Sequence, residues 1–172
     1  MKIVILGFSG SGKSTLAKNL SNHYNLPLLH IDRVQFLPNW VVRDKAERDM
    51  MIKEFIDSNE SWVIDGNYTS STPERFELAD LIIFLDYNRF TCYKNAMKRY
   101  KNNKNNTRSD MADGCIEKMD IEFKKWVFYK GRTPKKRKQL LDITKKCPNH
   151  YIFKNRKQLF SFYDKYNIKY TK

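Results

Sequence analysis

Short apolar runs alternate with amphipathic segments along the chain. Five runs have the length and residue types of strands buried on both faces of a parallel sheet: residues 3–6, 28–31, 62–64, 81–85 and 151–153. Helical spacing of apolar side chains predicts helices over about 13–23, 73–79 and 89–101, and others beginning at Asp44, near Cys115, at Thr133 and after Asn155. This alternation predicts an α/β fold with a doubly wound parallel sheet.

Polar residues mark several helix starts. Asp44 and Glu47 have the spacing of a capping box, and Thr72-Pro73 and Thr133-Pro134 each place a capping residue before a proline. The stretch 101–108 is polar and has no apolar periodicity, so we expect a mobile loop there.

A glycine-rich segment stands between the first apolar run and the first predicted helix. Residues 7–14 match the pattern GxxxxGK[ST] at every fixed position. Such a loop surrounds phosphates with backbone N–H groups at a helix N-terminus. Lys13 would reach the β- and γ-phosphates, and the Ser14 hydroxyl would bind Mg²⁺. The sequence thus predicts ATP and Mg²⁺ as cofactors, with nucleotide-binding residues Gly7, Ser9, Gly10, Ser11, Gly12, Lys13, Ser14 and Thr15.

Two acidic residues follow predicted strands. Asp32 comes just after the second strand and Asp65 ends the third, so both face the crevice at the carboxyl edge of the sheet. One carboxylate would hold Mg²⁺ and the other would accept a proton from a substrate hydroxyl, and the sequence leaves this assignment open. We place Asp65 with Ser14 among the metal ligands. The alternative for each acid, and more so for Asp86, is an ordinary loop carboxylate or helix cap.

These residues resemble the adenylate-kinase-like P-loop kinases, and most closely the small DNA topology modulation proteins. The resemblance covers nearly the whole chain and rests on residues 7–14, 30–32, 36–40, 62–68, 79–86, 108–115 and 153–157. It implies a three-layer α/β/α P-loop fold with strand order 2-3-1-4-5, in one domain over 1–172, and a helical lid inserted at about 99–132. Arg99, Arg108 and Arg132 are the lid arginines that it implies for catalysis beside Lys13, and Arg156 would lie near the base of ATP.

One segment departs from the resemblance. Asp65-Gly66 looks like the acid–glycine pair of nucleotide kinases, but Asn67-Tyr68-Thr69 follows, where those kinases have an apolar residue, proline and an arginine for a monophosphate. The departure argues against a nucleoside monophosphate acceptor. An anionic acceptor would then depend on Arg33, Arg43 or Arg75, none of which matches by motif.

Composition narrows the class of protein. The chain has 172 residues, of which 41% are hydrophobic, so it can bury a core. The longest apolar run, residues 81–85, is too short for a transmembrane helix, and the first strand has no signal-peptide cleavage site. The three cysteines fit neither a disulfide framework nor a zinc site. We expect a cytoplasmic protein with reduced thiols and no membrane partner.

Charge is distributed unevenly. The chain has a net charge of +14, but residues 1–86 carry −3 and residues 87–172 carry +17. Either a polyanion binds the second half or its lysines form a solvated surface. Residues 124–138 mix basic and aromatic side chains, typical of nucleic-acid surfaces, although the apolar ones also fit a buried helix face, which we favour. Two further side chains, His30 and Trp40, also have two interpretations. Each either contacts the substrate or packs against neighbouring residues within the fold.

The leading hypothesis is an ATP- and Mg²⁺-dependent phosphotransferase acting on an unidentified small acceptor. The alternatives are a nucleic-acid-binding DNA topology modulation protein with a regulatory nucleotide site, and a nucleotide-binding protein with weak hydrolysis. No DNA-reading module is evident. A chain with a net charge of +14 will bind some DNA at low salt whatever its function. Under the leading hypothesis, we expect this binding to be weak and non-specific and to fade near physiological salt.

Overall fold

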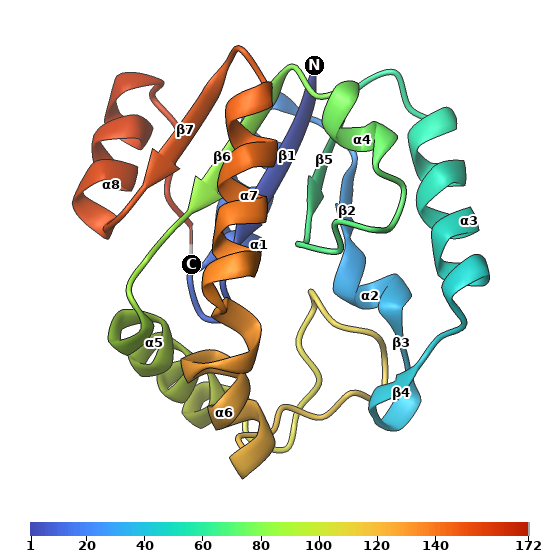
Figure 1. Cartoon of the computed structure of the whole chain (residues 1–172), viewed down its shortest axis with the longest axis vertical. Coiled ribbons are helices and arrows are strands. Elements are labelled where there is room, and N and C mark those ends of the chain that lie inside the picture. The colour runs from blue at the N-terminus through green and yellow to red at the C-terminus, as the bar shows by residue number, and fades with distance from the viewer. Residues whose placement is uncertain (172) are drawn as a thin grey trace.

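Five parallel strands form the centre of the computed structural model, which describes residues 1–171. They are β1 (Lys2–Gly7), β2 (Leu28–His30), β5 (Trp62–Asp65), β6 (Leu81–Leu85) and β7 (His150–Phe153). Their order in the sheet is β2-β5-β1-β6-β7 (Figure 1). Counted in chain order among these five strands, this is 2-3-1-4-5, so the predicted sheet is confirmed.

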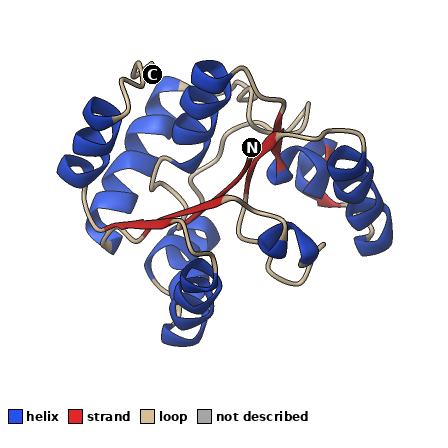
Figure 2. Cartoon of the chain, turned by 90° about the horizontal axis from the view of Figure 1, so that it is seen from above, coloured by secondary structure: helices blue, strands red, loops and turns tan. Residues whose placement is uncertain are grey.

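Helices cover both faces of the sheet, seen edge-on in Figure 2. The longer ones are α1 (Lys13–Tyr24), α3 (Lys45–Asp57), α5 (Arg89–Asn102), α6 (Ile121–Phe128), α7 (Pro134–Lys146) and α8 (Arg156–Lys165). In Figure 1, α7 lies in front of the sheet and α1 behind it. The central strands β1 and β6 are enclosed between these layers, and residues 3–6 and 82–85 are fully buried. These buried residues are all apolar because neither face of the two strands meets water there.

The predicted caps are mostly confirmed. The side chain of Asp44 accepts hydrogen bonds from the backbone N–H groups of Ala46 and Glu47. Thr133 and Asn155 cap α7 and α8 in the same way. Thr72 does not cap a helix: its φ is +46°, its side chain makes no capping bond, and α4 (Glu74–Glu77) is shorter than predicted.

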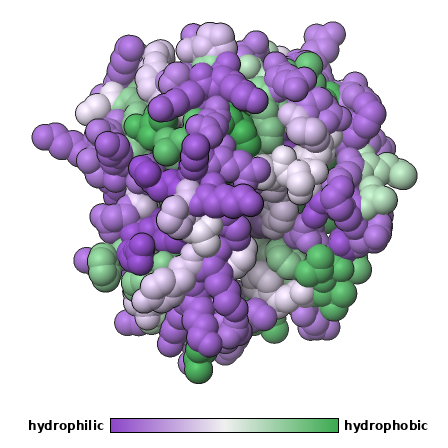
Figure 3. All heavy atoms as spheres, viewed as in Figure 1, coloured by the Kyte–Doolittle hydropathy of each residue, from purple (hydrophilic) through white to green (hydrophobic). Residues whose placement is uncertain are grey.

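Two short elements were not predicted. The second apolar run ends as a strand at His30, because α2 (Ile31–Gln35) begins at the next residue. An antiparallel hairpin follows, formed by β3 (Phe36–Leu37) and β4 (Val41–Val42) around the 3-10 turn η1 (Pro38–Trp40). Its two valines, Val41 and Val42, are exposed. Figure 3 shows a hydrophobic patch at the lower right of the molecule, the side on which the hairpin lies in Figure 1.

The segment 103–120 contains no helix, so the helix predicted near Cys115 is wrong. The chain instead forms isolated bridges that join Lys104 to Glu117 and Thr107 to Ile116. Its apolar side chains do not follow a helical period; Met111, Ala112 and Cys115 are buried together against Phe36 and Trp40 of the hairpin. The segment therefore has an apolar anchor that its polar start does not reveal.

Two more features bear on the sequence analysis: the state of the three cysteines and the length of the apolar helices. Cys92, Cys115 and Cys147 are buried free thiols, as predicted. Among residues 1–171, no helix is long and apolar enough to cross a membrane.

Candidate active site

The glycine-rich loop lies between β1 and α1 and is held from two sides. Gly10 has a φ of +80°, and a Cβ at this position would come within 2.1 Å of the carbonyl oxygen of Cys92 on α5. On the other side, the Asn67 side chain accepts a hydrogen bond from the Gly7 N–H at 3.0 Å and donates one to the Gly7 carbonyl at 2.8 Å. The loop conformation is thus set by the protein itself.

Side chains from three later helices reach the outer part of the loop. Asn95 of α5 donates to the Gly10 carbonyl at 2.9 Å, and Arg156 of α8 donates to Asn95 at 3.4 Å. Trp126 of α6 donates through Nε1 to the Ser9 hydroxyl at 3.2 Å. Arg156, predicted near the base of ATP, therefore lies one side chain away from the loop.

Ser14, Asp65 and His30 form a hydrogen-bonded chain beside the loop. The Ser14 hydroxyl donates to Asp65 Oδ2 at 3.1 Å, and His30 Nδ1 lies 2.5 Å from Asp65 Oδ1. Strand register explains the second contact, because His30 and Asp65 are paired residues at the ends of β2 and β5. Burial lowers the pKa of His30, but the hydrogen bond and charge of Asp65, with smaller effects of Asp110 and Asp32, raise it overall.

Lys13 begins α1 and is partly buried. Among residues 1–171, no carboxylate forms an ion pair with its ammonium group. Its positive charge is therefore free for an anionic ligand.

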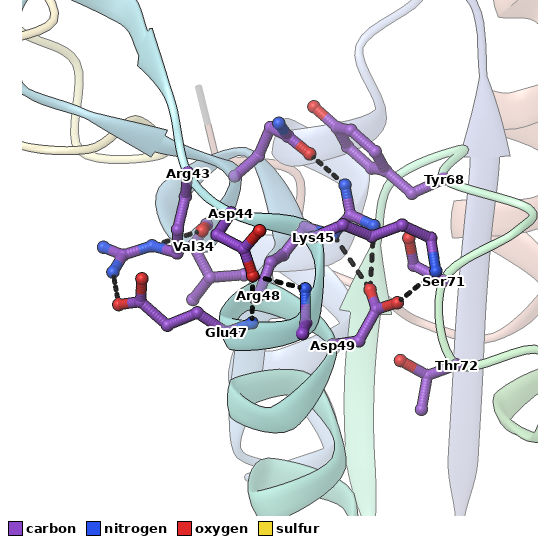
Figure 4. A network of polar contacts seen from close by, with 12 residues as sticks. Val34, Arg43, Asp44, Lys45, Glu47, Arg48, Asp49, Tyr68, Ser71 and Thr72 are labelled. Atoms are coloured by element: carbon purple, nitrogen blue, oxygen red, sulfur yellow. Dashed lines mark hydrogen bonds and ion pairs between the residues drawn. The ribbon is translucent and has the colours of Figure 1, made fainter.

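Asp32 points toward a tyrosine from the unusual segment after β5. The Tyr68 hydroxyl donates to Asp32 Oδ1 at 2.7 Å, and burial followed by the charge of Asp32 raises the pKa of Tyr68. The Arg48 guanidinium lies over the Tyr68 ring, 5.6 Å from its centre, in the network of Figure 4. Arg48 also donates to Gln35 and Asp49. Tyr68 thus connects Asp32 to the N-terminal turn of α3.

The arginines considered for an anionic acceptor have different surroundings. Arg75 is fully buried and donates to the carbonyls of residues 68, 71 and 72, and burial lowers its pKa to about 10. Arg43 forms an ion pair with Glu47 and donates to the Val34 carbonyl. Arg33 is exposed on α2. Arg75 therefore stabilises a loop and is not available to a ligand.

The arginines Arg99 and Arg108 meet at one buried glutamate. Glu117 is 4% exposed, and its two oxygens lie 2.9 Å from Arg99 Nε and 2.5 Å from Arg108 Nε. Burial and the neighbouring Arg108 lower the pKa of Arg99, against the opposite effect of Glu117. The structure thus brings two of the three predicted lid arginines together.

Asp110 belongs to the same segment. Arg108 forms an ion pair with it at 2.9 Å. Burial raises the pKa of Asp110, but Arg108, Ser14 and His30 together hold it below its usual range. Asp110 therefore lies close to the Ser14–Asp65–His30 chain. Asp110 lies within the segment 108–115 that carries the resemblance, but the sequence did not predict it as a site residue. Glu117 was not predicted at all, because neither residue follows a strand or belongs to a recognisable spacing.

Arg132, the third predicted arginine, lies on the side of the loop near Phe8. Its guanidinium is 4.2 Å from the centre of the Phe8 ring, and it donates to the Tyr87 carbonyl at 2.9 Å. Asp86 forms a two-point ion pair with Arg137 of α7. Asp86 therefore has a structural role, because its carboxylate joins the end of β6 to α7 through Arg137.

The Ser14 and Asp65 oxygens fit a magnesium ion. Mg²⁺ prefers oxygen ligands and usually takes only one or two from the protein, completing its shell with water and substrate phosphates. A hydroxyl and a carboxylate 3.1 Å apart beside a phosphate-binding loop meet this requirement. No group of three His, Cys, Asp or Glu side chains suited to a metal occurs in the described part of the chain.

The fold is a five-stranded parallel α/β sheet with a loop of the pattern GxxxxGK[ST] between β1 and α1. No family model matches the chain, and no curated protein matches it. Among solved structures, shikimate kinase from Bacteroides thetaiotaomicron matches with a TM-score of 0.55 at 13% identity, over 97% of this chain and 96% of that one. Deoxyadenosine kinase from M. mycoides, with products dCMP and dCDP bound, matches at 0.51 and 13%, over 97% and 99%.

A gluconokinase from Sinorhizobium meliloti matches over 58% of this chain and 65% of its own length, at 19% identity and a TM-score of 0.44. The chain shares its fold with the shikimate kinase and the deoxyadenosine kinase.

Proposed function

We propose that this protein is an ATP- and Mg²⁺-dependent phosphotransferase that acts on a small acceptor bearing a hydroxyl group. The observation that carries the proposal is the hydrogen-bonded chain from Ser14 through Asp65 to His30, which stands at the carboxyl edge of the sheet beside a preformed loop with an unpaired lysine. A loop that only bound nucleotide would not need a second carboxylate, Asp32, facing the same crevice.

The residues have distinct proposed roles. Backbone N–H groups of the loop and Lys13 bind the β- and γ-phosphates. Ser14 and Asp65 hold Mg²⁺, which supplies charge neutralisation at the transferring phosphoryl group. Asp32 accepts the proton of the acceptor hydroxyl, and the Tyr68 hydroxyl fixes the carboxylate in place. Asp65 is assigned to the metal because Ser14 already contacts it.

Residues 99–132 act as the lid in this proposal. Arg99 and Arg108 use Nε to hold Glu117, which leaves the outer nitrogens of Arg99 for the phosphoryl group that is transferred. Arg132 would approach the loop from the Phe8 side. ATP and acceptor together would order the polar part of the segment.

A panel of nucleosides, nucleotides, sugars, polyols and hydroxy acids tests the proposal. We expect ADP to form from ATP only when one class of acceptor is present, with the acceptor gaining one phosphoryl group by mass spectrometry. Removal of Mg²⁺ with EDTA should abolish the transfer. ADP formation that no acceptor stimulates would favour a hydrolase or a nucleotide sensor instead.

A further inference from the structure

A groove runs beside α7, which belongs to the half of the sequence with the excess positive charge. Its first part is a cavity of about 490 Å³ between the loop after β6 and the start of α7, and a neighbouring cavity of about 420 Å³ continues along α7. Arg89, Arg132 and Arg137 line both cavities, which makes them one continuous groove.

The groove is strongly basic. Its cationic side chains are Arg89, Arg132, Arg137, Lys138, Lys145 and Lys154, and its acidic ones are Asp86 and Asp142. Asp86 is already neutralised by Arg137. The Nε of Arg132 is buried without a hydrogen-bond partner. Within the described residues, neither Arg89 nor Lys145 forms an ion pair, so the groove offers several free charges to an anion.

Exposed aromatic rings stand at the end of the groove nearest the P-loop. Phe90 lines the first cavity and is 72% exposed, and Tyr129, 65% exposed, lies beneath the Arg89 guanidinium at 5.7 Å. Both pack against Phe128. The sequence favoured a buried helix face for the aromatics of 124–138, but on α6 only Val127 is buried. Exposing large rings costs hydrophobic free energy, and such rings often mark a binding surface.

We propose that this groove binds a single strand of nucleic acid. An extended chain of phosphates matches cations spaced along a groove, and unstacked bases match exposed aromatic rings beside it. A duplex would satisfy the cations but would keep its bases away from Phe90 and Tyr129. A small phosphate ligand would use neither the length of the groove nor the rings. The groove includes none of Lys13, Asp32 and Asp65, but it shares Arg132 with the proposed lid. The variants below therefore leave Arg132 unchanged, so that loss of groove binding and loss of phosphotransfer can be told apart.

Fluorescence anisotropy with an oligothymidine of about 12 nucleotides tests the groove, over a range of salt concentrations. The triple variant Arg89→Ala, Lys138→Ala, Lys145→Ala should weaken binding and reduce the salt slope by about 2, since each phosphate contact on a single strand contributes about 0.7. The matched control removes the same charge elsewhere, with Lys18→Ala, Lys157→Ala and Lys169→Ala, and should keep most of the affinity and slope.

A second pair of variants tests the rings. Phe90→Ala with Tyr129→Ala should lower affinity about tenfold without changing the salt slope, because stacking is lost and charge is not. The matching duplex should bind more weakly than the single strand and ignore these two substitutions. Binding of ATP should persist in every variant, which shows that each one is folded.

Equal loss of binding in the groove variant and its charge-matched control would overturn the proposal, because diffuse surface charge would then explain the binding. An unchanged affinity after removal of both rings, with inorganic polyphosphate bound as tightly as the oligonucleotide, would also overturn it in favour of a site for phosphate chains alone.

Discussion

The glycine-rich loop and the segment 103–120 come close to each other at Ser14 and Asp110 but are held in different ways. The loop follows a fully buried strand, is packed against α5 at Gly10 and is bracketed by Asn67. The segment has no helix or strand of its own and is attached at a small apolar cluster and at Glu117. Backbone packing makes the loop ready for a ligand, whereas a few side-chain contacts leave the segment able to open.

The crevice acids should show the largest effect on rate. We expect Asp32→Asn to lower turnover about 100-fold or more, because the carboxamide cannot accept the acceptor proton. Asp65→Asn should instead raise the Mg²⁺ concentration needed for activity, since one charged ligand is lost. Steady-state kinetics against Mg²⁺ concentration separates the two. Normal kinetics in both variants would show that the chemistry is elsewhere.

Alanine substitutions at two glycines of the loop should destabilise the protein by different amounts. Gly10→Ala should lower the free energy of unfolding by about 2–5 kcal/mol, because its Cβ would collide with the Cys92 carbonyl and the left-handed backbone adds strain. Gly12→Ala meets no atom within 4 Å and should cost only about 1–2 kcal/mol from its φ of +94°. Urea unfolding measures both. Equal costs would mean that α5 does not support the loop.

Glu117 should control the segment and leave the loop unaffected. In Glu117→Gln, Arg99 and Arg108 lose the buried negative charge that they share. Hydrogen exchange of the backbone amides of 103–120 should therefore become about tenfold faster. Exchange in β1 should not change. The control Glu122→Gln removes an exposed glutamate that pairs only with surface lysines. Slow exchange in 103–120 that neither substitution nor ATP alters would contradict a lid.

The smallest expected effect is a pH dependence from His30. Its pKa is raised in the folded protein, so its pair with Asp65 contributes fully below about pH 6.5 and is lost as pH rises through the raised value. The stability difference between wild type and His30→Asn should be on the order of 1 kcal/mol at low pH and shrink above neutrality. The control is His23→Asn, which removes a histidine from the exposed side of α1.

The parts of the fold that the sequence predicts are those fixed by local patterns. A buried strand, three glycines and a lysine specify the loop. Strand register pairs Asp65 with His30, and the start of α1 places Ser14 beside the same carboxylate. Helix α2 is too short to show a period, so it was missed. The packing of Met111 and Cys115 on Trp40 joins residues more than 70 positions apart, and no local signal reports it.

The same reason limits the prediction of the site. Arg99, Arg108 and Arg132 came from a resemblance, and their catalytic roles stay predictions. Their contacts with Glu117 and Phe8 depend on how distant segments fold together.

Calorimetric titration with ATP and Mg²⁺ tests the central claim, that residues 7–14 bind the triphosphate of ATP for transfer. Lys13→Ala should keep the fold, because no ion pair among residues 1–171 involves the Lys13 ammonium group. It should weaken ATP binding and reduce turnover by orders of magnitude. Lys18→Ala, exposed on the same helix, should behave like wild type. Unchanged ATP binding and turnover in a folded Lys13→Ala protein would contradict the account.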